Sequence, residues 1–181
     1  MRRNSSNRLS NSYGFSLLEL VLTITLMSLA IAITASIVNF NSTTVTTTCD
    51  DLMNSLTSIE SAALNYSSDK SIMPSSLTDT AFVPTYLFPP KAPKTFDASY
   101  GTSGYYLAQQ TGQTSPNNGY YVCARATVTS STDTAFAGIL AASEKMSAAK
   151  FFYNTTCPAT SNMATPSSST TVYTTYWFTR Y

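Results

Sequence analysis

Residues 12–40 read "SYGFSLLELVLTITLMSLAIAITASIVNF", and from Phe15 onward this stretch is almost wholly apolar apart from small hydroxyl side chains. As a helix, 15–38 would be about 36 Å long at ~1.5 Å per residue, enough to cross a hydrocarbon core of ~30 Å. Its one carboxylate, Glu19, lies near its start. A carboxylate inside a bilayer is costly and usually has a partner. The stretch therefore predicts a membrane-length helix in which Glu19 has a partner group.

The preceding residues, 1–14, are polar, and arginines at 2, 3 and 8 supply all their charge. An ordinary secretory signal is cut after its apolar segment, whereas the short, flexible junction here lies before it, at Gly14–Phe15. Positive charge before the apolar run and none directly after it predicts a cytoplasmic N-terminus. Glu19 then has two interpretations. It reaches lipid headgroups from the helix end, or it pairs with the α-amine that a cut after Gly14 would free on Phe15, in the same chain or a neighbouring one.

The run Gly14-Phe15-Ser16-Leu17-Leu18-Glu19-Leu20, between a short basic leader and a long apolar segment, resembles the class III signal of type IV prepilins and type II secretion pseudopilins. The resemblance implies that a prepilin peptidase removes residues 1–14 after Gly14 and N-methylates Phe15. It implies that the subunit waits in the bacterial inner membrane, in contact with lipid. The inner-membrane assembly machinery then polymerises it with copies of itself into an extracellular helical filament, in which Glu19 and the Phe15 amine set the register between subunits.

The same resemblance implies an α+β fold, in which a long N-terminal helix packs on a small antiparallel sheet in a lollipop arrangement. The expected parts are a leader (1–14), a transmembrane and filament-core helix (15–38), its amphipathic continuation (39–67), a proline-rich loop from helix to sheet (68–103), and a sheet head with a disulfide-bonded C-terminal region (104–181). Many bacterial major pilins have a proline about 22 residues into the mature helix, and often a glycine before it, but 28–36 contain neither. The helix therefore stays continuous there, or Thr34 and Ser36 soften it by bonding to carbonyls.

The residues after the apolar run predict a second, amphipathic helical segment. Apolar or small side chains recur at spacings of three and four from Val45 to Leu64, which favours one core-facing stripe. The threonines of 43–48 have low helix propensity and allow a bend. We expect the helix to end near 67–70.

The proline-rich segment 73–97 predicts neither a regular helix nor a central strand. Its apolar side chains are expected to pack it on the sheet; they are Leu77, Phe82, Tyr86, Leu87 and Phe88.

Segments rich in aromatic and β-branched residues at 104–110 and 119–128, with turn residues between them, predict an antiparallel hairpin. In the second strand the smaller, more apolar side chains at 120, 122, 124 and 126 are expected to face the long helix. The segment Thr134–Phe152 predicts a short helix capped by Asp133 and frayed at Gly138. Residues 170–181 predict a closing strand.

Three cysteines are present, and two of them, Cys123 and Cys157, lie in the expected head. A disulfide is the expected state if the head lies outside the cytoplasm, and the resemblance implies the pair Cys123–Cys157. Cys49 lies on the core-facing stripe, where a buried free thiol is the commoner role. The pairs Cys49–Cys123 and Cys49–Cys157 stay open.

The sequence gives little sign of catalytic chemistry. It has no histidine, no closely spaced cysteine ligands and no phosphate-binding glycine motif, and scattered acids such as Asp79, Asp97 and Asp133 do not have calcium-ligand spacing. From Phe15 on, the chain has seven Lys/Arg and nine Asp/Glu. It therefore lacks the excess of basic residues that is typical of nucleic-acid binding. We therefore expect no enzyme, no cofactor and no metal.

The expected function is that of a structural subunit of a type IV pilus filament. A pseudopilin or a minor pilin is the alternative within this class. The alternative from another class is a membrane-anchored binding module that never polymerises, and in such a protein Glu19 would be dispensable.

Overall fold

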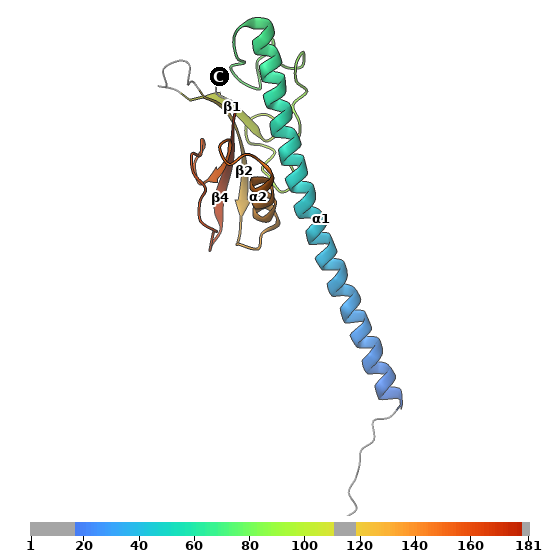
Figure 1. The fold of residues 1–181 in the computed structure, drawn as a ribbon. Helices are drawn as coiled ribbons and strands as arrows, with labels where there is room; N and C mark the ends of the chain where they lie inside the picture. Colours follow the sequence, from blue (N-terminus) through green and yellow to red (C-terminus); the bar gives the residue numbers. More distant parts are fainter. Residues whose placement is uncertain (1–16, 111–118, 179–181) are drawn as a thin grey trace, which may run out of the picture. The chain divides into compact units, whose positions relative to one another are not determined.

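The computed structural model describes residues 17–110 and 119–178, apart from the side chains of 32, 33 and 35–40. The chain divides into two compact units, 1–40 and 41–181. In order, the elements are α1 (Leu17–Lys70), β1 (Tyr105–Gln109), β2 (Tyr120–Val128), α2 (Thr134–Lys145), β3 (Phe151–Asn154) and β4 (Thr170–Trp177) (Figure 1). This order confirms the α+β class with a small antiparallel sheet.

Helix α1 contains 54 residues and ends at Lys70, where the sequence predicted an end. The helix continues through the threonines of 43–48, so their low helix propensity does not end it. Thr46 Oγ1 donates to the carbonyl of Ser42 at 3.0 Å, and Thr34 Oγ1 donates to the carbonyls of Ala30 and Ile31 at 3.0 and 2.9 Å. These hydroxyls bond to the helix without breaking it.

The part of α1 in unit 41–181 packs through one side of the helix. Spacings of three and four place these side chains on the same side of the helix. All of them are buried, as the sequence pattern predicted for most of them: Cys49, Leu52, Leu56, Ile59, Ala63 and Tyr66.

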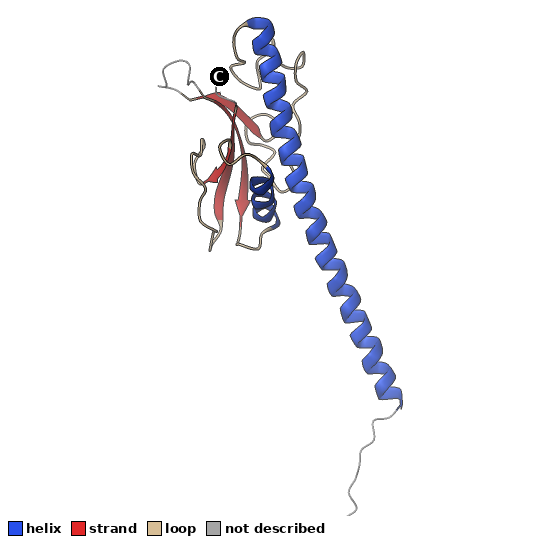
Figure 2. Cartoon of the chain, in the orientation of Figure 1, coloured by secondary structure: helices blue, strands red, loops and turns tan. Residues whose placement is uncertain are grey.

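The four strands form an antiparallel sheet in the order β1-β2-β4-β3. Val122, Ala124 and Ala126 of β2 join the core formed with α1 and α2, which lie over that face (Figure 2). Tyr121 and Cys123 belong instead to a second cluster with Trp177. The two predicted faces of the second strand are confirmed.

Helix α2 begins after Asp133, whose carboxylate accepts the N–H of Ala135 at 2.8 Å, so the predicted cap is confirmed. Gly138 lies inside the helix and is buried, so the predicted fraying is wrong. A Cβ placed on Gly138 would lie 2.5 Å from Thr48 Cγ2 of α1, which shows that this glycine permits close helix packing.

The expected helical segment up to Phe152 is too long, because α2 ends at Lys145 and β3 begins at Phe151. The run Phe-Phe-Tyr-Asn alternates between buried and half-buried positions, because successive side chains of a strand point to opposite faces of the sheet. Pairing with β4 therefore determines its structure, and this long-range contact is not visible in local periodicity.

Segment 71–104 contains turns and irregular backbone but neither helix nor strand, as predicted. Leu77, Phe82 and Leu87 are buried, whereas Phe88 is 83% exposed, so its expected packing is wrong. Leu87 points into the core, and Phe88 precedes a proline, which favours extended backbone. Adjacent side chains of an extended backbone point in opposite directions, and Phe88 therefore points outward.

Candidate functional site

The predicted processing residues Gly14 and Phe15 lie outside the described residues. Glu19 lies in the first turn of α1, where a carboxylate interacts favourably with the helix N-terminus. The pairing of Glu19 with the Phe15 amine therefore stays a prediction, and the helix terminus gives Glu19 a second favourable interaction.

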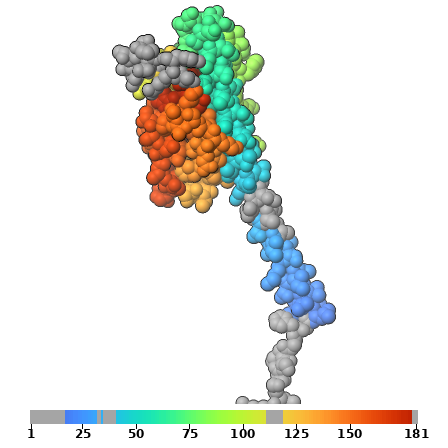
Figure 3. Space-filling model, in the orientation of Figure 1, coloured from blue at the N-terminus to red at the C-terminus, as the bar shows by residue number. Residues whose placement is uncertain are grey.

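Most of the described side chains of 17–31, in the N-terminal part of α1 (blue in Figure 3), are apolar and exposed. Successive residues of a helix point about 100° apart, so runs such as Leu20-Val21-Leu22 place apolar groups in several directions. Exposed large apolar side chains here range from 50% to 83% exposure: Leu17, Leu18, Leu20, Val21, Leu22, Ile24, Leu26, Met27, Leu29 and Ile31. We call this set the apolar collar of α1.

The hydroxyl groups within this surface bond to the helix itself. Thr23 Oγ1 donates to the carbonyl of Leu20 at 2.9 Å, and Ser28 Oγ donates to that of Ile24 at 2.8 Å. Thr25 donates to carbonyls of the preceding turn in the same way. Because these hydroxyls already have acceptors, burying them costs much less than burying unpaired polar groups.

Within the part of the chain that the structure describes, no helix combines the length and the apolar character needed to cross a lipid bilayer. The expected span 15–38 includes residues outside that part and stays a prediction.

In unit 41–181 the predicted disulfide is present. The sulfur atoms of Cys123 and Cys157 are 2.08 Å apart, which links β2 to the segment after β3. Cys49 is a free thiol, 1% exposed, so the two alternative pairings do not occur. Burial raises the pKa of the Cys49 thiol, which makes it a poor nucleophile.

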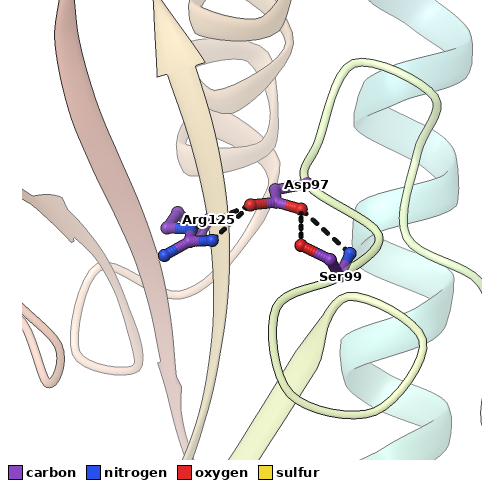
Figure 4. Close-up of polar contacts among 3 residues, drawn as sticks. All are labelled: Asp97, Ser99 and Arg125. Atoms are coloured by element: carbon purple, nitrogen blue, oxygen red, sulfur yellow. Dashed lines mark hydrogen bonds and ion pairs between the residues drawn. The ribbon is translucent and has the colours of Figure 1, made fainter.

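A polar cluster on β2 fastens the proline-rich segment to the sheet (Figure 4). One oxygen of Asp97 accepts both the Nε of Arg125, at 3.1 Å, and its Nη2. The other oxygen accepts the N–H and the hydroxyl of Ser99 at 2.9 and 2.6 Å. The hydrogen bond of the Ser99 hydroxyl, then that of Arg125, and then that of the Ser99 N–H lower the pKa of Asp97 to about 2.

The guanidinium carbon of Arg125 also lies 4.9 Å from the ring centroid of Tyr100, as in a cation–π contact. The N–H of Asp97 donates to the carbonyl of Arg125 at 2.8 Å. Since both charged groups are already paired, this cluster holds the loop in place and leaves little capacity for a ligand.

The other scattered acids have separate local roles. Asp79 accepts the N–H of Ala81 at 2.9 Å in a turn, and Asp133 caps α2. Among the described residues, no three histidine, cysteine or acidic side chains are grouped as metal ligands.

Sequence reasoning missed Glu60, a residue of α1 that is 8% exposed and accepts a hydrogen bond from Tyr176 of β4. The only signal was its position next to Ile59 on the apolar stripe, and its partners are 90 and 116 positions away in the sequence.

Comparison of the chain with protein-family models, with curated proteins and with solved structures finds no match.

Proposed function

We propose that this chain is the structural subunit of an extracellular type IV pilus-like filament. In this proposal a prepilin peptidase removes residues 1–14 and methylates Phe15. The subunit is held in the inner membrane until the assembly machinery inserts it into a homopolymer at the cell surface.

The observation that carries the proposal is the apolar collar, which begins directly after the prepilin-like motif. An apolar stripe would suit one partner helix, whereas apolar groups that point in several directions favour apolar surroundings on more than one side. Lipid supplies such surroundings before assembly, and several neighbouring helices supply them in a filament core. The self-bonded hydroxyls of Thr23, Thr25 and Ser28 fit both environments.

The disulfide between Cys123 and Cys157 supports an extracellular head, because such bonds persist mainly in oxidising compartments. The pairing of both charges in the Asp97–Arg125 cluster supports a structural rather than a catalytic head.

The first test is to replace Gly14 by a bulky residue and Glu19 by alanine in separate variants of the full chain. Gly14→Val should leave uncleaved precursor in the membrane and no filaments. Glu19→Ala should be cleaved normally but yield at least tenfold fewer filaments, because an incoming subunit loses its ionic partner. Mass spectrometry of the N-terminus and electron microscopy of sheared cell-surface material measure the two outcomes.

Glu144→Ala is the matched control, since it removes an exposed acid of α2 and should leave filament yield unchanged. An unprocessed Met1 in surface filaments would exclude the cleavage. Normal processing of the wild type without any polymer would favour the membrane-anchored binding module instead.

A further inference from the structure

Glu60 is a buried carboxylate in a helix–sheet interface whose buried side chains are mostly apolar. It follows Ile59 on α1, and both of its oxygens have partners from the opposite side of the interface. Oε1 accepts Lys150 Nζ at 2.9 Å, and Oε2 accepts the hydroxyl of Tyr176 at 2.7 Å. The side chains of Glu60 and Lys150 are 11% and 26% exposed, so water screens this ion pair only weakly.

The two partners are held firmly relative to each other by the sheet. Lys150 directly precedes β3, Tyr176 lies in β4, and Phe151 is paired with Tyr176. The carbonyl of Lys150 accepts the N–H of Trp177 at 2.8 Å, and Lys150 Nζ lies 5.6 Å from the Tyr176 ring centroid. The sheet therefore presents an ammonium and a hydroxyl at one fixed point below α1.

Stability alone is a poor reason for such a cluster. Replacing a buried ion pair by well-packed apolar side chains is often neutral or stabilising, and the best-attested use of buried polar groups is to select one register among several. An apolar helix stripe that repeats every three and four residues packs similarly after a shift of one turn, about 5.4 Å. Directional bonds at a single point remove that ambiguity.

We propose that Glu60, Lys150 and Tyr176 form a registry cluster that fixes the axial position of α1 on the sheet. A shift of one turn would place Leu56 or Leu64 opposite the ammonium and the hydroxyl. It would also separate the Glu60 carboxylate from both of its partners, and an unpaired charge in an interface is strongly disfavoured. Only one axial position satisfies all three groups.

The consequence for assembly rests on the proposed function. A regular filament requires every copy to hold its head at the same position along its own helix, and tension on a filament loads the helix–sheet interface in shear. The registry cluster supplies both a unique position and a directional resistance to sliding.

The test uses an engineered disulfide as a reporter of register, in full-length protein in detergent micelles with Cys49→Ala to remove the free thiol. Thr48 Oγ1 of α1 lies 3.2 Å from Thr95 Oγ1, so Thr48→Cys with Thr95→Cys reports the native position. Thr44→Cys with Thr95→Cys reports a shift of one turn, in which Leu56 replaces Glu60. Both pairs are compared with and without the apolar triple change Glu60→Leu, Lys150→Met and Tyr176→Phe.

With the native cluster, the 48/95 disulfide should form almost completely and the 44/95 disulfide hardly at all. With the apolar triple change, the protein should keep its circular dichroism spectrum and its thermal midpoint. The 48/95 yield should then fall by at least half while the 44/95 yield rises.

A folded triple variant with an unchanged 48/95 yield would overturn the proposal, because apolar packing and the Gly138 contact would then fix the register alone. A triple variant that does not fold would also overturn it, since the cluster would then supply stability and not selection. The assay needs no filament. It therefore tests the registry cluster even if the proposed filament function is wrong.

Discussion

Tyr105 carries a polar group that the core of unit 41–181 does not satisfy. The side chain is completely buried, and its hydroxyl has no hydrogen-bond partner of acceptable geometry among the described residues. Burial raises the pKa of Tyr105 to about 12, an effect that the nearby Ser55 hydroxyl partly offsets. An unsatisfied buried hydroxyl lowers stability, because it lost its water without gaining a partner.

We predict that Tyr105→Phe raises the free energy of unfolding by on the order of 1 kcal/mol, since it removes only the unsatisfied group. Tyr176→Phe is the matched control and should lower it, because Tyr176 donates to Glu60 at 2.7 Å. Urea unfolding followed by circular dichroism measures both. If Tyr105→Phe destabilises the protein as much as the control does, its hydroxyl is bonded in solution.

At the scale of elements, the Asp97–Arg125 cluster holds the proline-rich segment against β2. The pKa of Asp97 is lowered to about 2 in the folded chain, below the ~3.9 of an unfolded aspartate. A depressed pKa contributes stability that is fully present above the unfolded value and is lost as pH falls through the folded value. This contribution should therefore disappear between about pH 4 and about pH 2.

We predict that Asp97→Asn lowers the thermal midpoint at neutral pH and flattens its fall between about pH 4 and about pH 2. The exposed helix residue Asp51 provides a control, because Asp51→Asn should preserve the acid dependence of the wild type. Calorimetry over this pH range makes the comparison. Equal slopes for wild type and Asp97→Asn would show that the loop does not depend on this carboxylate.

Elements with strong local signals could be predicted from the sequence, and elements defined by distant partners could not. The apolar stripe predicted that α1 ends near Lys70, and the turn residues on either side predicted β1 and β2. By contrast, β3 follows a helical pattern and becomes a strand only because Phe151–Asn154 pair with β4. From the sequence alone, Gly138 predicts local fraying of a helix. The structure shows that Thr48 packs against it.

The same contrast applies to the candidate site. The motif around Gly14, Phe15 and Glu19 is local in sequence, so it could be read directly, although its chemistry stays a prediction. Glu60 could not be assigned a role, because Lys150 and Tyr176 approach it only in the folded unit.

At the scale of the whole molecule, the disulfide connects the middle of the sheet to the segment that follows β3. The chain between Cys123 and Cys157 contains the rest of β2, α2 and β3, so the bond closes a loop of 34 residues. In the chain-entropy account, closing a loop of this length stabilises the folded state by about 4 kcal/mol, because it restricts the unfolded chain. The native sheet also brings its own hydrogen bonds and core, which remain when the bond is reduced.

We therefore predict that reduction lowers the free energy of unfolding of unit 41–181 by about 2–4 kcal/mol without unfolding it at room temperature. Guanidinium titrations of the Cys49→Ala protein with and without a phosphine reductant measure the difference, and this background prevents exchange with the free thiol. An alkylation assay confirms that both remaining cysteines are reduced. Identical midpoints would mean that the reduced unfolded chain is already as restricted as the oxidised one. A chain that keeps its fold after reduction would still lose resistance to mechanical stress, because β2 and the segment after β3 would no longer be joined by the disulfide.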